Sequence, residues 1–414
     1  MNLPQEFIEY TSNLFGLDRW QHFLKALEEP APTSIRFNPY KKGEKIIFPQ
    51  AIPVAWCRQG YYLKERPDFT KDPLLHAGVY YVQEAASMFL DLVLQQYIKK
   101  PLLALDLCAA PGGKSTLMRA SLPQGSLLVS NEPDRKRANI LLENMQKQGH
   151  SEVLITHNYP IDFNKTNWTF DLILVDAPCS GEGLFRKDKE AINEWNLQNV
   201  LFCQKRQRQI LSDIWPCLKE GGLLIYSTCT FNTRENEENV KFIMQELGAD
   251  ILPVSIKPEC QITGSLLKDF KGPVYRFIPG ITKSEGLFMA VLRKKGSSSK
   301  PALLPQTARR YAQQNKLIHL LYDGNPLPEQ KGKEQIPTAA QALSLNFPKD
   351  KYPQVELTLE QARRFLHRES FALPSGTPKG FVIVCYKKRA LGFMKNLCDR
   401  ANNLYPKNWA IHNL

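Results

Sequence analysis

The chain has 414 residues, 43% of them hydrophobic, and a formal net charge of +13. This length allows two or three domains with ordinary cores, so the fold needs no disulfides. The nine cysteines show no CxxC or Cys/His metal-ligand spacing, and no apolar run is long enough to span a membrane. The composition therefore predicts reduced thiols, no metal, no membrane association and a monomeric, cytoplasmic protein.

The positive charge is concentrated near the C-terminus. Residues 341–414 carry twelve basic and five acidic side chains, a net +7. A basic segment of this kind predicts a polyanionic partner, and a solvated basic face is the alternative.

Residues 1–75 predict a small α/β module. Helical patterns cover 3–16 and 17–30, and strand-like segments follow at 34–38 (SIRFN) and 46–50 (IIFPQ).

Residues 76–295 repeat a pattern of strand, turn and helix. The expected strands are 102–110, 126–133, 152–158, 170–178 and 223–229, and the expected helices include 113–120, 134–149 and 191–218. Strands that alternate with helices of this length predict an α/β fold, a Rossmann-like doubly wound parallel sheet. In such sheets, ligands bind beyond the carboxyl ends of the strands.

Residues 296–342 form a predicted linker and connecting segment, because 296–306 (GSSSKPALLPQ) has the composition of a linker. Residues 343–414 predict a small basic domain, with a helix over 358–367 and strands at 381–386 and 391–393. Its aromatic side chains are candidates either for the core or for stacking on unpaired bases.

The turn after the first strand, CAAPGGK at 108–114, is the first chemical signal. Its two glycines allow a ligand to approach the backbone, and the next helix offers free N–H groups. Glu132 ends the second strand, where an acid can bind the hydroxyls of a ribose. Together these features predict a cofactor that contains adenosine. A tight turn and an exposed loop acid are the alternatives.

Two cysteines follow neighbouring strands: Cys179, in Asp176-Ala177-Pro178-Cys179, and Cys229, after Thr228. A thiolate that adds to C6 of a pyrimidine makes C5 nucleophilic, and Asp176 is placed to protonate N3. Buried structural cysteines are the alternative. The segment 232–235 (NTRE) predicts a capping box for the next helix.

Four segments resemble the motifs of the Nop/Sun family of RNA cytosine-5 methyltransferases: LDLCAAPGGKST (105–116), NEPDRKR (131–137), LVDAPCSGEGLFRKD (174–188) and YSTCTFNTRENEENV (226–240). SIRFNP (34–39) and EGLFMAVLRK (285–294) are similar to the flanking motifs of that family. The resemblance covers residues 34–295. The pair of thiols is specific, because it distinguishes RNA enzymes from DNA enzymes.

The resemblance implies that Cys229 is the nucleophile, that Cys179 assists product release and that Asp176 contacts the base. S-adenosyl-L-methionine would bind Glu132, Asp176 and the turn formed by Cys108, Ala109, Ala110, Pro111, Gly112, Gly113 and Lys114. One position departs from the family. The acid that usually follows the third strand is absent, and either Asn158 or Asp162 is the candidate to replace it.

The resemblance also implies RNA contacts by Arg36, Arg186 and Lys187. The tail from 343 is similar to the PUA-like domain of the bacterial subgroup that modifies small-subunit rRNA, and its cluster Lys387-Lys388-Arg389 would bind RNA. The expected function is therefore methylation of C5 of a cytosine in 16S rRNA. A tRNA enzyme of the same chemistry and a non-catalytic rRNA-binding assembly factor are the alternatives.

Overall fold

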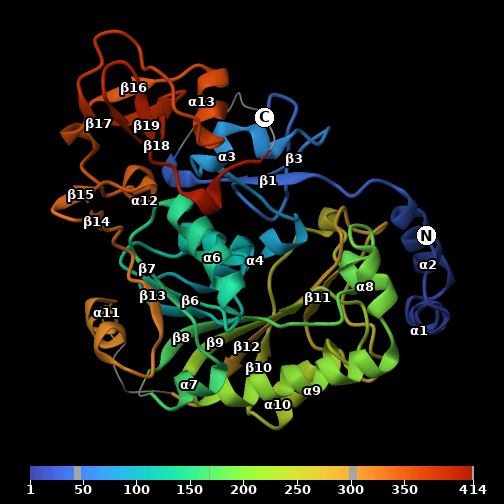
Figure 1. The fold of residues 1–414 in the computed structure, drawn as a ribbon. Coiled ribbons are helices and arrows are strands. Elements are labelled where there is room, and N and C mark those ends of the chain that lie inside the picture. Colours follow the sequence, from blue (N-terminus) through green and yellow to red (C-terminus); the bar gives the residue numbers. More distant parts are fainter. Residues whose placement is uncertain (42–47, 167, 298–304, 413–414) are drawn as a thin grey trace.

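The computed structural model describes residues 1–41, 48–166, 168–297 and 305–412. A large central sheet, covered by helices on both faces, lies next to two smaller sheets formed by the two ends of the chain (Figure 1). Within these ranges, no helix is long and apolar enough to cross a membrane.

The N-terminal module begins with two amphipathic helices, α1 (Gln5–Phe15) and α2 (Leu17–Glu28). A four-stranded antiparallel sheet in the order β2-β3-β1-β4 follows. Its strands are β1 (Ser34–Phe37), β2 (Ile52–Pro53), β3 (Gly60–Tyr62) and β4 (Tyr80–Val82). The short helix α3 (Pro73–His76) lies between β3 and β4 in the chain. The sheet thus continues past residue 75. Of the strand predicted at 46–50, residues 46–47 lie outside the described residues and 48–50 form a bend and turn.

The central sheet has nine strands: β5 (Leu103–Asp106), β6 (Leu127–Asn131), β7 (Val153–Thr156), β8 (Phe170–Asp176), β9 (Leu218–Thr228), β10 (Ala249–Leu252), β11 (Val274–Phe277), β12 (Leu287–Lys294) and β13 (Leu320–Tyr322). The order is β10-β12-β9-β8-β5-β6-β7-β13, and β11 pairs with β12. The five strands from β9 to β7 are parallel, whereas β10, β11, β12 and β13 pair antiparallel. The chain order changes direction between β5 and β8, where such sheets bind ligands.

Each face of the sheet has its own apolar core. Alternate residues of a strand point to opposite faces, so Ala104 belongs to one core while Leu103 and Leu105 belong to the other. The first core is covered by α4 (Phe89–Tyr97), α5 (Gly113–Ser121) and α6 (Arg135–Gln148). The second core is covered by α7 (Pro160–Asn164), α9 (Leu197–Ile214) and α10 (Glu237–Gln245) (Figure 1). The predicted doubly wound sheet is therefore confirmed.

The single helix predicted over 191–218 is wrong. The structure has α8 (Lys189–Glu194) and α9, separated at Trp195 and Asn196. The Asn196 side chain accepts a hydrogen bond from the Asn199 amide at 2.8 Å and caps α9. The break turns the Trp195 indole inward, where its Nε1 donates to Glu182 at 3.0 Å.

The connecting segment adds to the catalytic sheet. Residues 298–304, most of the predicted linker, lie outside the described residues. After them, α11 (Pro305–Gln314) buries Ala308 and Ala312 against the second core, and β13 pairs with β7. The segment ends with β14 (Glu329–Lys331), β15 (Glu334–Ile336) and α12 (Ala339–Leu343).

The C-terminal domain contains β16 (Gln354–Glu356), α13 (Leu359–Leu366), β17 (Gly380–Tyr386), β18 (Arg389–Asn396) and β19 (Ala401–Asn403). Its aromatic side chains mostly build the core, because five of the six predicted candidates are buried: Phe365, Phe371, Phe393, Tyr405 and Trp409. Tyr386 is partly exposed.

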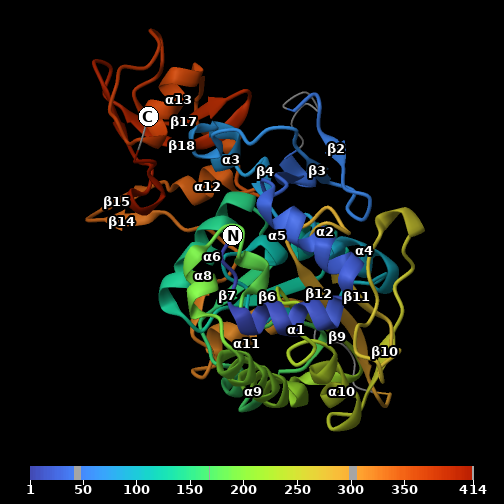
Figure 2. The ribbon, with the colours of Figure 1, turned by 90° about the vertical axis from the view of Figure 1, so that its right-hand side faces the viewer.

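The C-terminal domain and the N-terminal module share one hydrophobic core. A single cluster contains Ile35, Leu74 and Tyr80 from the module, together with Phe365 and Tyr405 from the domain. Helix α3 packs against α13 and β18. Figure 2 shows α3 and β4 of the N-terminal module beside α13, β17 and β18 of the C-terminal domain, above the catalytic sheet.

Candidate active site

The two thiols meet because their strands are neighbours. Strands β8 and β9 are parallel, and Asp176 at the end of β8 lies opposite Ser227. The loops that follow these strands place Cys179 Sγ 3.1 Å from Cys229 Sγ. Both thiols are partly buried. The sequence prediction had placed them at one edge of the sheet, and the structure brings them into contact.

The hydrogen bond with Cys229, together with burial, raises the pKa of the Cys179 thiol well above its ordinary value. Cys179 therefore remains protonated near neutral pH and can donate its S–H to the sulfur of Cys229. Burial also raises the pKa of Cys108, so this third thiol at the same edge remains protonated.

Glu182 connects the two thiol loops. This buried carboxylate accepts hydrogen bonds from the Asn232 amide at 3.1 Å and from the Asn232 side chain at 2.8 Å, while the Gly183 amide donates to the Cys229 carbonyl at 2.7 Å. Sequence reasoning missed Glu182. Its only signal was its place three residues after Cys179.

Glu235 is a second buried carboxylate behind the thiols. It accepts from the Ser180 amide at 3.0 Å and from the Gln207 side chain at 2.7 Å. Burial, followed by the charge of Glu182, raises the pKa of Glu235 to about 7. Half of the predicted capping box at 232–235 is present, because the Asn232 side chain accepts from the Glu235 backbone amide at 2.8 Å. The reciprocal bond is absent, because the Asn232 backbone amide donates to Glu182 at 3.1 Å, and helix α10 begins only at Glu237.

Asp176 lies between the thiols and the cofactor turn. Its Oδ2 is 2.8 Å from Lys114 Nζ, and its Oδ1 accepts from the Ser227 hydroxyl at 2.7 Å. Burial alone would lower the pKa of Lys114, but the charge and hydrogen bond of Asp176 outweigh burial and raise it. Lys114 therefore remains charged and holds Asp176 in place. Ser227, which sequence reasoning did not single out, supplies the second hold.

The predicted cofactor turn has the expected form. Gly112 has φ of 115° and is the N-cap of α5, a conformation that favours glycine. The amide of Ala109 donates to the Asn131 carbonyl at 2.8 Å, and Asn144 donates to the Pro111 carbonyl at 2.8 Å. The turn from 108 to 114 is thus anchored to the second strand and to α6.

The residues at this turn fit an adenosine-containing cofactor. Glu132 is 2% exposed, and its Oε2 has no hydrogen-bond partner, although Arg137 Nη1 lies 3.5 Å away. The fully buried Asp106 also has an Oδ1 atom without a partner. A buried carboxylate oxygen without a donor is costly, and hydroxyls or an ammonium of a ligand would satisfy it.

Both candidates for the missing acid after the third strand have other partners. The Asn158 side chain donates to the Leu317 carbonyl at 2.8 Å and accepts from the His319 amide at 3.0 Å, so it anchors the approach to β13. Asp162 accepts from the Tyr159 amide at 3.0 Å and caps α7. A contact of Asn158 with the cofactor stays a prediction.

The prediction that Arg36 contacts RNA is corrected by the structure. Its side chain is 2% exposed, with Nε 2.7 Å from Gln83 Oε1 and Nη2 2.7 Å from Thr116 Oγ1. It joins β1 of the N-terminal module to α5 of the cofactor turn. A guanidinium buried in that way cannot bind a phosphate of RNA.

Arg186 and Lys187, in contrast, line a cleft of about 980 Å³ between the N-terminal module and the loops near the thiols. Lys64, Arg66 and Lys283 line it as well, and Glu29 is the one acidic residue among the described residues that line it. Arg186 donates to the Ser284 carbonyl at 2.9 Å, and Lys187 pairs with Glu285 at 2.6 Å. Lys64, Arg66 and Lys283 were not predicted, because they lie outside the motifs.

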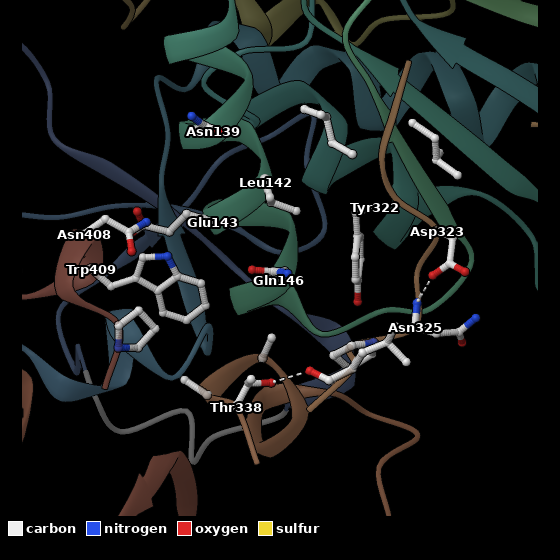
Figure 3. Close-up of a pocket in the computed structure, with 17 residues that line it drawn as sticks. Asn139, Leu142, Glu143, Gln146, Tyr322, Asp323, Asn325, Thr338, Asn408 and Trp409 are labelled. Carbon is white, nitrogen blue, oxygen red and sulfur yellow. Dashed lines mark hydrogen bonds between the residues drawn. The ribbon is translucent and has the colours of Figure 1, made fainter. Parts of the chain in front are cut away.

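A second cleft, of about 850 Å³, lies between α6, β13 and residues 406–409 (Figure 3). Its ionisable lining residues include Glu143 and Asp323, and its other polar groups are mostly amides. Acidic lining disfavours a polyanion, and the thiols are not among the residues that line this cleft.

The predicted cluster at 387–389 lies in the turn between β17 and β18 and at the start of β18. Lys387 and Lys388 are exposed, and Arg389 is partly buried. Lys388 and Arg389 line a small cleft at the junction with the N-terminal module.

A doubly wound sheet with an antiparallel strand inserted at one edge, a Gly-rich turn after its first strand and an acid after its second defines a Rossmann-like methyltransferase. Three family models match the chain: 16S rRNA methyltransferase RsmB/F over residues 95–293, the N-terminal domain of 16S rRNA methyltransferase RsmF over 3–85, and the methyltransferase RsmF PUA domain over 352–411. The chain belongs to the RsmB/F methyltransferase family. The predicted family resemblance and the C-terminal PUA domain are thereby confirmed.

Curated relatives resemble the chain in sequence, and a solved structure resembles it in fold. The chain is 34% identical over 295 residues to ribosomal RNA small subunit methyltransferase F of Aliivibrio fischeri strain MJ11, an alignment that spans 67% of this chain and 61% of the relative. The protein of the same name from Shewanella oneidensis is 28% identical, over 93% of this chain and 92% of the relative. The crystal structure of NSun6 from Pyrococcus horikoshii with SFG has a TM-score of 0.60 at 21% identity, covering 71% of this chain and 99% of that one.

Proposed function

We propose that the protein transfers a methyl group from S-adenosyl-L-methionine to C5 of a cytosine in RNA. The observation that carries the proposal is the contact of Cys179 with Cys229, 3.1 Å apart at the ends of neighbouring strands, close to the Gly-rich turn whose Lys114 is hydrogen-bonded to Asp176. Membership of the RsmB/F methyltransferase family supports it.

Cys229 is the proposed nucleophile. Its thiolate adds to C6 of the cytosine, and the electron pair of the 5,6 double bond makes C5 nucleophilic. The S–H of Cys179 stabilises the thiolate before attack, since its raised pKa keeps it protonated. Asp176, held by Lys114 and Ser227, lies at the same edge to contact the base as charge develops on the ring.

Cys179 is proposed to assist release. After methylation, a water molecule takes the C5 proton, the electrons of that C–H bond re-form the 5,6 double bond, and the bond between Cys229 Sγ and C6 breaks with its electron pair leaving on sulfur. Cys179 lies beside that sulfur and donates a hydrogen bond to the departing thiolate. Without Cys179, the protein–RNA adduct is expected to persist.

The cofactor would be held by the turn from Cys108 to Lys114 and by Glu132. The free N–H groups that follow Gly112 would bind the carboxylate of the methionine part, and the Glu132 oxygen without a donor would accept from the ribose hydroxyls. When bound, S-adenosyl-L-methionine supplies the electrophilic methyl group. A neighbour in fold, NSun6, was crystallised with SFG, which is consistent with this assignment.

The cleft that contains Arg186 and Lys187 is the proposed path of the RNA backbone beside the thiols. Its lining side chains carry five cations and one carboxylate, and cations give salt-dependent affinity for phosphates. The target cytosine must leave any stack to reach Cys229, which costs a few kcal/mol and is easiest in a single-stranded region.

We propose 16S rRNA as the substrate, because the family models and the curated relatives carry that description. A tRNA substrate and a non-catalytic role in rRNA assembly are the weaker alternatives. The second alternative is disfavoured because the chain keeps both thiols and the Gly-Gly turn. A monomeric state and a cytoplasmic location remain predictions from the sequence.

The test compares wild-type protein with Cys229→Ala and Cys179→Ala, each incubated with methyl-labelled cofactor and, in separate reactions, with small ribosomal subunits, their RNA or tRNA. We expect label in RNA with the wild type, a protein–RNA band on denaturing gels with Cys179→Ala, and neither with Cys229→Ala. Cys398→Ser removes an exposed thiol in the C-terminal domain and should behave as wild type. Normal methyl transfer by Cys229→Ala would overturn the assignment. Transfer to tRNA alone would move the substrate to the first alternative.

A further inference from the structure

The Glu182 carboxylate receives hydrogen bonds from two directions. The amides of Phe231 and Asn232, in the loop that follows Cys229, donate to its Oε2. The Trp195 indole, two residues before α9, donates to its Oε1 at 3.0 Å. Glu182 is 1% exposed and lies in the loop of the other thiol. One buried carboxylate therefore connects both thiol loops to the start of α9.

Two of the residues that donate to Glu182 pack against the first two helices of the chain. The Trp195 ring meets the Phe7 ring of α1 edge-on, with the ring centres 5.2 Å apart. The Phe231 ring meets the Phe23 ring of α2, also edge-on, with the ring centres 5.1 Å apart. All four rings are buried in one apolar cluster, so α1 and α2 support the side of the thiol site on which Glu182 is held.

Helix α1 also contacts the loop of Cys229 directly. The Tyr10 hydroxyl accepts from the Thr233 amide at 3.1 Å and lies 3.0 Å from the Thr233 hydroxyl. The loop is therefore fixed through three consecutive amides, of which Glu182 accepts two and Tyr10 accepts the third.

We propose that Glu182 and Trp195 are positioning residues that set the distance between the two sulfur atoms, and that α1 helps to hold them in place. The proposed release step needs the Cys179 S–H beside the sulfur of Cys229, and a displacement of about 1 Å at an active site can cost about 100-fold in rate. A carboxylate has about four acceptor positions, and four donors fill those of Glu182. Glu182 therefore acts through the loops and not by taking a proton from the substrate.

This inference rests on the proposed function, since it requires both thiols to act on RNA. The first variant is Trp195→Phe, which keeps an aromatic ring against α1 but removes the N–H donor to Glu182. Its matched control is Trp215→Phe, because Trp215 is buried in the second core at the opposite end of β9 from the thiols. Glu182→Gln is the stronger variant, because its amide nitrogen is a donor that would face other donors. Tyr10→Phe tests the contribution of α1.

Two readouts are compared with the Tm of each variant. The first is steady-state methyl transfer to small ribosomal subunits, which gives kcat and KM. The second needs no RNA. Phenylarsine oxide condenses with two adjacent thiols, forming two As–S bonds and releasing one water molecule, and mass spectrometry of the protein measures the rate of this capture. Cys179→Ala gives the background rate.

We expect Glu182→Gln to lower kcat by about 10- to 100-fold and Trp195→Phe by about 3- to 10-fold, with KM for the RNA unchanged. Capture by phenylarsine oxide should slow in the same order, whereas Trp215→Phe should lower only Tm. Wild-type kcat and capture in Trp195→Phe would overturn the inference, even if Glu182→Gln did not fold. Equal losses of kcat in Trp195→Phe and Trp215→Phe would also overturn it, because the loss would then follow stability. Wild-type capture in Tyr10→Phe would reject the role of α1.

The two proposals fail separately. If wild-type protein transfers no methyl group to RNA, the proposed function fails, whatever the rate of capture. If wild-type protein does transfer it and Trp195→Phe matches the wild type in kcat and capture, the positioning role alone fails.

Discussion

The edge of the central sheet and the core shared by the two ends of the chain are built in different ways. At the edge, Asp176, Cys179 and Cys229 follow strands of one βαβ array, and parallel pairing alone brings them together. In the shared core, Leu74 and Tyr405 are more than three hundred residues apart, and no local pattern connects them.

The difference shows where function and stability reside. The edge is polar, and two buried carboxylates, Glu182 and Glu235, fix the positions of its loops. Buried charges of this kind cost stability and are typical of functional sites. The shared core is apolar, and it joins two segments that each contain a four-stranded sheet. Changes in the core should therefore alter stability on both sides, whereas changes at the edge should alter cofactor or RNA chemistry.

The largest effect is expected from Leu74→Ala. Leu74 is 4% exposed in α3, which packs against α13 and β18, so we expect a loss of about 2–5 kcal/mol in the free energy of unfolding. Denaturant unfolding measures the loss, and hydrogen exchange should show weaker protection in both the N-terminal module and the C-terminal domain. Leu327→Ala, at a position 75% exposed, should cost less than about 0.5 kcal/mol. Weaker protection confined to the module would mean that the two segments are independent.

An intermediate effect is expected from Glu132→Gln at the edge. Loss of a charged acceptor for two hydroxyls should weaken S-adenosyl-L-methionine binding by about 1–3 kcal/mol, or roughly 5- to 150-fold in Kd. Calorimetric titration measures this change. Asp162→Asn is the matched control, because the Asp162 carboxylate caps α7. If Asp162→Asn weakened binding as much as Glu132→Gln, Asp162 would be the missing acid after all.

The smallest effect is expected from Glu235→Gln, read as a change in pH dependence. Burial raises the folded-state pKa of Glu235 to about 7, so the folded protein binds more protons than the unfolded chain between about pH 4.5 and 7. The contribution of Glu235 to the free energy of unfolding is therefore greatest below that range, and it is lost as pH rises through about 7. In the variant, the decline in Tm between about pH 5 and 8 should be smaller by a few degrees. Asp106, whose pKa is also raised to about 7 by burial, should keep part of the decline. An unchanged slope would mean that Glu235 titrates normally.

The parts of the molecule that were predictable are those in which local pattern and topology agree. Alternating strands and helices defined the parallel sheet, and the sheet placed the cofactor turn and both thiols at one edge. The family resemblance then supplied separate roles for Cys179 and Cys229. The interruption at Asn196 was missed because the helical pattern is apolar on both sides of it.

The remaining corrections concern long-range contacts. The sequence motif around Arg36 does not show whether the arginine contacts RNA or other side chains of the protein. In the structure its partners are Gln83 and Thr116. Likewise, β13 comes from a polar segment that pairs with β7, and its approach uses the amide of Asn158. Nothing in the local sequence indicates these partners, because each lies at least 47 residues away.

The shared core also constrains how the protein is made. The apolar side of α3 and β4 is synthesised early, but the residues that cover it, up to Ile411, leave the ribosome last. During most of translation, the N-terminal sheet therefore presents an uncovered apolar surface, which is a hazard for aggregation. A chain that stops before residue 350 would keep both thiols and the cofactor turn, yet it would expose this surface permanently.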